Sequence, residues 1–169
     1  MLFALAGPVR NPPLVISTED YLSYVDEALH GMAEIVSELG DELANRRPDL
    51  PGANAPFAIL THCLGVLEYW AGHVVAGRTI HRDRPAEFRA TGRVAELSDH
   101  VGAQRARFVD DLAGADPFAP PRGEVSAADD ALPLGRTQGG ALLHVYHELA
   151  RHHGQLEITR DILLADRSR

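Results

Sequence analysis

Four segments of this 169-residue chain carry apolar residues at spacings of three and four positions, the pattern of a helix that buries one face. They cover residues 18–46, 56–77, 93–112 and 137–164. None of them shows the strict alternation of apolar and polar residues that is typical of a strand. No internal repeat and no domain boundary interrupts the series. We therefore expect one all-α domain, a four-helix bundle that spans residues 1–169.

The connections between these segments constrain the order of the helices. Residues 1–16 contain three prolines and predict an extended arm rather than a helix. The connection from Arg78 to Thr91 has about 13 residues and can extend to roughly 40 Å. That is longer than a 20-residue helix, which spans about 30 Å, so the second and third helices can run parallel. The Pro/Gly/Asp-rich loop 113–136 is unusually long, and we expect it to cover one mouth of the bundle.

The amino-acid composition indicates which classes of binding partner and which cellular location to expect. The chain has 24 acidic residues and 16 basic ones, all of them Arg, and its net charge is −8. An acidic chain without a basic cluster predicts no binding to nucleic acid or to an anionic membrane. No segment approaches the roughly 20 apolar residues that a transmembrane helix needs. The lone Cys63 excludes an intrachain disulfide, and the N-terminus lacks a basic signal region, so we expect a cytoplasmic protein.

Three polar residues fall on faces that should be buried. On a helical wheel of the last segment, His152 lies within the apolar stripe, and Glu148 lies at its edge one turn earlier. On the second segment, His62 lies in the middle of the apolar face. Two imidazoles and a carboxylate directed into an apolar core need partners, because an unpaired buried charge costs several kcal/mol.

Two interpretations of this set stay open at the level of the residues. The first is a buried Glu–His hydrogen bond beside an ordinary core histidine. The second is a metal site, since ligands at i and i+4 of one helix with a third from another helix are how bundles hold ions. A site of two His and one Glu also leaves coordination positions open for catalysis. His144 and Glu148 are four apart as well, but the wheel favours Glu148 with His152.

The neighbours of these ligands are also predicted from the wheel. The second ring nitrogens of His62 and His152 need hydrogen-bond partners. The candidates, which the wheel does not rank, are Tyr69, His73, His144, Gln155 and Thr159; of these, Tyr69 and His73 also fit as ordinary core residues. We expect no catalytic side chain beyond the metal ligands. The charges Arg105, Arg107, Asp110 and Asp111 on the third segment are interpreted as a solvated face.

The two ligand segments resemble a known family. Residues 144–157, HVYHELARHHGQLE, resemble the final helix of the DinB-like metalloenzyme superfamily, and residues 61–70, THCLGVLEYW, resemble its second helix. Alignment on Gly154 places His152 at the last ligand of the family and Glu148 one turn upstream, where most members have His. The Glu variant is similar to the mycothiol-dependent branch, which includes maleylpyruvate isomerase and mycothiol S-transferases, with zinc on His, Glu and His.

This resemblance implies an up-down-down-up bundle and a detoxification enzyme. Its activity would be transfer of a low-molecular-weight thiol, mycothiol, onto a small electrophile, with Zn²⁺ as cofactor. The lysine-free composition fits the GC-rich actinobacteria that make mycothiol. Many DinB-like bundles are dimers, so a homodimer is expected.

Alternatives remain for metal and reaction. The ligand set also suits iron or nickel. The same site could serve a thiol-dependent isomerase or a metal-dependent hydrolase. A third alternative is a non-catalytic, stress-related bundle that only binds metal. The sequence does not identify the electrophile.

Overall fold

The computed structural model describes residues 14–125 and 136–167, and all regular elements in these residues are helices. They are α1 (Thr18–Ala44), α2 (Pro56–Val66) with its π-helical continuation η1 (Leu67–Val75), α3 (Arg84–Glu87), α4 (Val94–Leu112) and α5 (Gln138–Arg167). The predicted all-α bundle of four long helices is confirmed. The pattern did not predict the π-helical turn or the short α3. The predicted arm 1–16, apart from non-helical residues 14–16, lies outside the described residues, as does 126–135 of the long loop.

Local signals in the sequence explain where the helices begin. Ser17 caps α1, since its Oγ accepts a hydrogen bond from the Asp20 N–H at 2.9 Å. Pro56 opens α2, where its missing N–H is not needed. Asp83 caps α3 in the same way as Ser17, through the Ala86 N–H at 3.0 Å. Ser17 and Asp83 thus satisfy a free N–H group of the first helical turn, whereas Pro56 lacks such a group.

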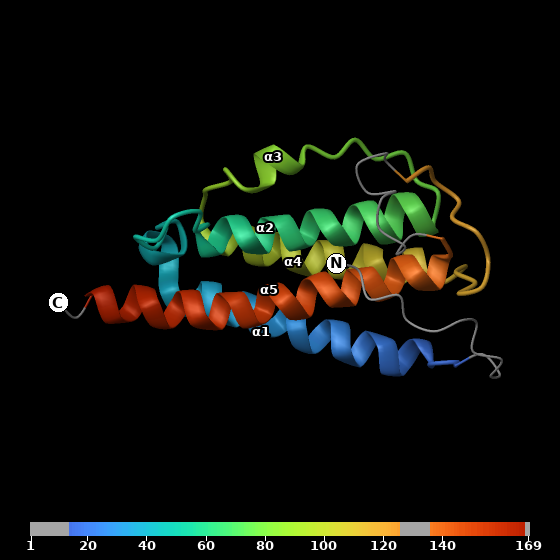
Figure 1. Cartoon of the computed structure of the whole chain (residues 1–169), viewed down its shortest axis with the longest axis horizontal. Coiled ribbons are helices and arrows are strands. Elements are labelled where there is room, and N and C mark those ends of the chain that lie inside the picture. Colours follow the sequence, from blue (N-terminus) through green and yellow to red (C-terminus); the bar gives the residue numbers. More distant parts are fainter. Residues whose placement is uncertain (1–13, 126–135, 168–169) are drawn as a thin grey trace, which may run out of the picture.

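The helices run up-down-down-up, as the resemblance implied (Figure 1). α1 and α5 are parallel neighbours: the Tyr21 hydroxyl near the start of α1 donates to the Leu142 carbonyl near the start of α5 at 2.5 Å. α2 and α4 run the other way, and the connection between η1 and α4, which carries α3, crosses the length of the bundle (Figure 1). This connection, residues 76–93, is called the crossover below.

The core is built from the apolar stripes that the sequence pattern predicted. Its largest fully buried side chains are Trp70, Phe108, Leu29, Met32, Ile59, Leu60, Leu64, Leu67, Leu149, Leu156, Leu163 and His62. His62 is the polar member of this set. Its place among aliphatic side chains from α1, α2 and α5 fixes where a polar site can form.

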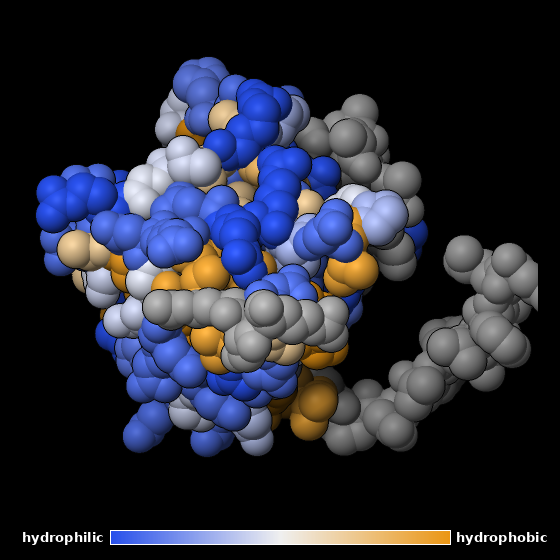
Figure 2. Space-filling model, turned by 90° about the vertical axis from the view of Figure 1, so that its left-hand side faces the viewer, coloured by the Kyte–Doolittle hydropathy of each residue, from blue (hydrophilic) through white to orange (hydrophobic). Residues whose placement is uncertain are grey.

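The two ends of the bundle differ. At the end where η1 stops and α5 begins, the Arg122 N–H donates to the Val74 carbonyl at 2.8 Å and the Gln138 N–H to the Ala119 carbonyl at 3.0 Å. The described part of the loop, 113–125, therefore packs against this end. At the opposite end, hydrophilic residues cover most of the visible described surface, with smaller apolar areas between them (Figure 2). Among the described residues, no helix combines the length and apolar character needed to cross a bilayer.

Candidate metal site

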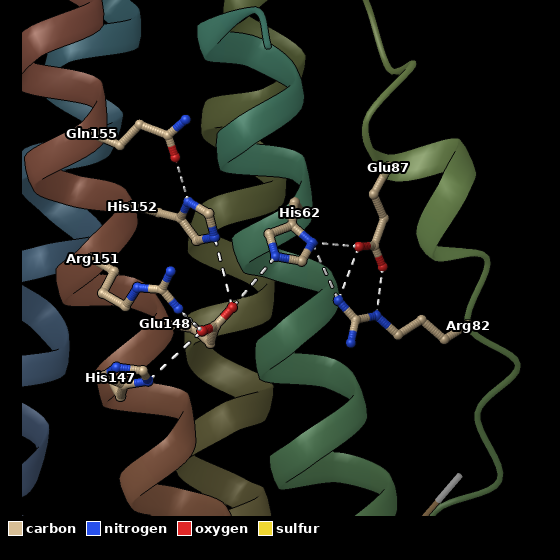
Figure 3. Close-up of polar contacts among 8 residues, drawn as sticks. All are labelled: His62, Arg82, Glu87, His147, Glu148, Arg151, His152 and Gln155. Atoms are coloured by element: carbon tan, nitrogen blue, oxygen red, sulfur yellow. Dashed lines mark hydrogen bonds and ion pairs between the residues drawn. The ribbon is translucent and has the colours of Figure 1, made fainter. Parts of the chain in front are cut away.

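The three predicted ligands meet between α2 and α5 (Figure 3). Nε2 of His62 lies 3.8 Å from Oε2 of Glu148, and Nε2 of His152 lies 3.7 Å from the same oxygen. The two imidazole rings stand edge to face, with centroids 5.0 Å apart. Because Glu148 and His152 are four residues apart on α5, they lie on the same face of that helix, and both face His62 of α2.

The donor atoms fit a metal ion better than they fit one another. His62 is only 1% exposed, and its Nε2 has no hydrogen-bond partner. A buried polar atom without a partner costs about 1–3 kcal/mol. The separations of 3.7 and 3.8 Å are too long for hydrogen bonds. Ligand atoms around a tetrahedral zinc ion, each about 2.0–2.1 Å from it, lie roughly 3.4 Å apart.

The charges of the cluster suit a cation. The imidazoles of His152 and then His62 hold the pKa of the Glu148 carboxyl well below its usual range, so Glu148 is ionised at neutral pH. For His62, burial is the largest influence and lowers the pKa, but the carboxylates of Glu148 and Glu87 together outweigh it and raise the pKa. The side chain of Glu148 is 14% exposed and that of His152 is 16% exposed. Solvent therefore reaches the site past Glu148 and His152 of α5, since His62 on the other side is buried.

A second carboxylate, which the sequence analysis missed, contacts the cluster from the crossover. Oε2 of Glu87 lies 2.8 Å from Nδ1 of His62, and Arg82 binds both oxygens of Glu87 (Figure 3). The Asp83-Arg84-Pro85 sequence is a helix-start signature that could have predicted α3. Nothing in the periodic pattern placed α3 beside His62, because that contact depends on the path of the crossover.

A second group of potential ligands shares Glu148. His144, His147 and Glu148 also bring donor atoms within 4.8 Å of one another. In this group the nearer oxygen is Oε1 of Glu148, which lies 3.7 Å from Nδ1 of His147 and accepts a hydrogen bond from Arg151 at 3.0 Å. His147 is largely exposed. This group uses α5 alone, whereas the first joins two helices.

The family model described as mycothiol S-transferase matches residues 20–164. The chain belongs to the mycothiol S-transferase family. The matched residues include α2, most of α5 and the crossover. The match confirms the resemblance to the mycothiol-dependent branch that was predicted from residues 61–70 and 144–157. No curated protein matches the chain.

The fold of this mycothiol S-transferase family member has a counterpart among solved structures. The chain is similar to a conserved protein of Enterococcus faecalis known from a crystal structure, with a TM-score of 0.64. The likeness covers 90% of this chain and 99% of the other, at 15% sequence identity. At that identity the likeness concerns the bundle fold alone.

The predicted neighbours of the ligands have different positions in this member of the family. Oε1 of Gln155 lies 2.8 Å from Nδ1 of His152, as expected for a residue that orients a ligand. His144 packs edge to face on Trp70, with centroids 4.5 Å apart, beside the cluster. Tyr69 stacks on His73 and lies under the guanidinium of Arg82.

His73 lies away from the cluster, although the wheel placed it on the same face as His62. Its Nδ1 lies 2.7 Å from the Arg78 carbonyl oxygen and its Nε2 lies 3.0 Å from the Glu124 carbonyl oxygen, so both nitrogens face loop backbone. Distance along the helix explains this position. His73 follows His62 by about three helical turns, so at 1.5 Å per residue it lies roughly 16 Å further along the axis, which a helical wheel does not show.

Proposed function

We propose that this chain is a metal-dependent thiol S-transferase whose divalent ion is held by His62, Glu148 and His152. Zinc is the expected metal and mycothiol the expected thiol. The observation that carries the proposal is that two imidazole nitrogens converge on one ionised carboxylate oxygen, at 3.7 and 3.8 Å, in a member of the mycothiol S-transferase family. Iron and nickel suit the same ligands and serve as alternatives in reconstitution.

The charge and the ligands of this site suit the binding of a thiolate. A divalent ion in it would lower the pKa of an incoming thiol and supply a thiolate near neutral pH. Ionised Glu148 and two neutral imidazoles leave one net positive charge on such a centre, which a thiolate balances. Gln155 holds the His152 ring by its Nδ1, so that Nε2 faces Glu148.

The nucleophilic sulfur comes from the co-substrate rather than from the protein. Cys63 is the one cysteine, and it is fully buried beside His62. Burial, followed by the charges of Glu148 and Glu87, raises the pKa of its thiol far above neutral pH. In the transfer, the sulfur of the external thiol bonds to an electrophilic carbon, the thiol proton is released, and the leaving group departs with its bonding electrons.

The first prediction tests the ligand set. Protein purified without a His tag should hold one divalent ion and should consume an electrophilic probe such as chlorodinitrobenzene only with a thiol, fastest with mycothiol. His62→Ala should lose the ion and at least about 100-fold in turnover, because removing a ligand leaves an incomplete site. His147→Ala is the matched control, since His147 belongs only to the group on α5.

Other outcomes would contradict the proposed ligands or indicate a different reaction. Loss of the ion in His147→Ala but not in His62→Ala would contradict the ligand assignment. Turnover that needs metal but no thiol would indicate a hydrolase, and thiol-dependent rearrangement without conjugation an isomerase. If Glu148→Ala lowers stability and the metal-loaded protein turns over no probe, the bundle only binds metal.

The cytoplasmic location and the homodimer stay predictions. The first rests on the lone cysteine and on a cell-internal thiol as substrate. The second rests on the superfamily resemblance. Cell fractionation and the molar mass in solution test them separately.

A further inference from the structure

We infer that Glu87 is a positioning residue that fixes the His62 ring for metal binding, so that the crossover is part of the metal site. The inference rests on the proposed site at His62, Glu148 and His152. It extends that site by an anchored carboxylate and by a third segment of the chain.

The first step is the contact between Glu87 and His62. Nδ1 of His62 and Oε2 of Glu87 are 2.8 Å apart, and Glu87 is 9% exposed. Nη2 of Arg82 also lies 3.3 Å from Nδ1, but it donates to Oε2 of Glu87 over the shorter distance of 2.9 Å. An ionised carboxylate can only accept a hydrogen bond, so Nδ1 carries the proton and donates it to the nearer Oε2. The other ring nitrogen, Nε2, is then bare and faces Glu148 and His152. Glu87 thus selects the tautomer that a metal ligand requires.

The second step is how the carboxylate itself is held. Arg82 donates to Glu87 from Nε to Oε1 at 2.7 Å and from Nη2 to Oε2 at 2.9 Å. This two-point contact restricts the carboxylate to one orientation, and the charge of Arg82 cancels that of Glu87. Phe88, the next residue, stacks on the His62 ring with centroids 4.4 Å apart. The crossover therefore holds the imidazole at its edge and on its face.

The third step is a glycine that admits the carboxylate. A Cβ at Gly65 of α2 would lie 2.2 Å from Oε1 and 2.7 Å from Cδ of Glu87. The Glu87 side chain can shift, but only by moving the carboxylate away from its place against α2. Alanine at position 65 should therefore displace Glu87 while the helix is retained, since alanine favours helix by about 1 kcal/mol over glycine.

The second prediction follows from these contacts. In Glu87→Ala and Gly65→Ala, the dissociation constant for Zn²⁺ or Co²⁺, measured by competition with a chromophoric chelator, should rise on the order of tenfold to a hundredfold. Glu87→Gln should lose less, because an amide oxygen still accepts from Nδ1. If Glu87→Ala does not fold, the other two variants decide.

Two control variants are available in the chain. Glu68 and Glu87 both line a cavity of about 360 Å³ beneath the crossover. Glu68, however, pairs with Arg78 and Arg107 and not with His62. Gly154 lies two residues from His152, and a Cβ there meets nothing within 4 Å. Glu68→Ala and Gly154→Ala should keep the wild-type metal affinity. Wild-type affinity in all three test variants, or equal losses in the controls, overturns the inference.

A readout in the metal-free protein separates this inference from the proposed function. The ¹⁵N shifts of the His62 ring, assigned by their loss in His62→Ala and recorded at alkaline pH, should show Nδ1–H in the wild type and a mixture of tautomers in Glu87→Ala. If the wild type binds no metal, the proposed function fails and this comparison still decides the role of Glu87. The same tautomer in both proteins overturns that role.

Discussion

Arg105 of α4 donates two hydrogen bonds to Asp26 of α1, from Nε at 3.0 Å and from Nη2 at 2.7 Å. The hydrogen bonds from Arg105 lower the pKa of Asp26 more than its partial burial raises it. Asp111, on the same helix as Arg105, is buried and binds Arg78 at 2.8 Å. The interpretation of these charges as a solvated face is therefore wrong for Arg105 and Asp111, which link elements.

The third prediction, at the residue scale, concerns Asp26. Because its pKa is lower in the folded than in the unfolded chain, its stabilising effect is present above the unfolded value of 3.8 and is lost as pH falls through the folded pKa. Asp26→Asn should lower the free energy of unfolding by about 0.5–1 kcal/mol at pH 7, since the pair is partly exposed.

Urea denaturation at pH 7 and at pH 2–3 measures this effect. The difference between wild type and Asp26→Asn should shrink at the acidic pH. Asp110→Asn, an exposed acidic residue of α4, is the control and should change little at either pH. A constant difference across the range would contradict the role of the ion pair.

At the scale of elements, α1 is not one uninterrupted helix. Gly40 has φ 64° and ψ 177° within it, so the helix kinks there. This region of backbone space is nearly restricted to glycine. Past the kink, Asn45 binds the Gly92 backbone and Asp41 caps the start of α4 through the Val94 N–H at 2.7 Å. The kink therefore lets the last turn of α1 reach α4.

The fourth prediction concerns this kink. A Cβ at Gly40 meets nothing within 4 Å, so Gly40→Ala tests backbone strain without a clash. It should lower the free energy of unfolding by about 1–3 kcal/mol in denaturant titrations. Gly102 in α4 is also open to a Cβ, and Gly102→Ala should be neutral or stabilising by up to about 1 kcal/mol. Equal effects of the two substitutions would argue against the kink.

At the scale of the whole molecule, the proposed metal site joins segments that are distant in the sequence. α2 supplies His62, α5 supplies Glu148 and His152, and the crossover supplies the Glu87 contact. A ligand that binds the folded chain alone raises its stability by mass action. An ion that bridges α2 and α5 should therefore stabilise the entire bundle and not only one helix.

The fifth prediction follows from this bridge. Zn²⁺ at about 100 times its dissociation constant should raise the free energy of unfolding by about 2.7 kcal/mol. Thermal unfolding with and without a chelator measures the effect. In His62→Ala the shift should disappear, and in His147→Ala it should persist. A metal-dependent shift that survives the loss of His62 would place the ion elsewhere.

The sequence by itself determined the four long helices and the three candidate ligands. A helix that buries an apolar stripe needs apolar residues three and four positions apart, and this spacing can be read directly from the sequence. His62, Glu148 and His152 could be singled out because polar residues stand out against apolar stripes. The family resemblance and the length of the crossover then gave the order of the helices.

The tertiary structure alone decided the surroundings of those ligands. Glu87 comes from a polar connection whose path no periodic pattern encodes, and Gly65 admits it only because two segments approach closely. His73 lies about three helical turns from His62 and contacts loop backbone, and Arg105 and Asp111 bind residues of other elements. These contacts depend on packing between segments distant in the chain, and spacing along one helix carries no information about that packing.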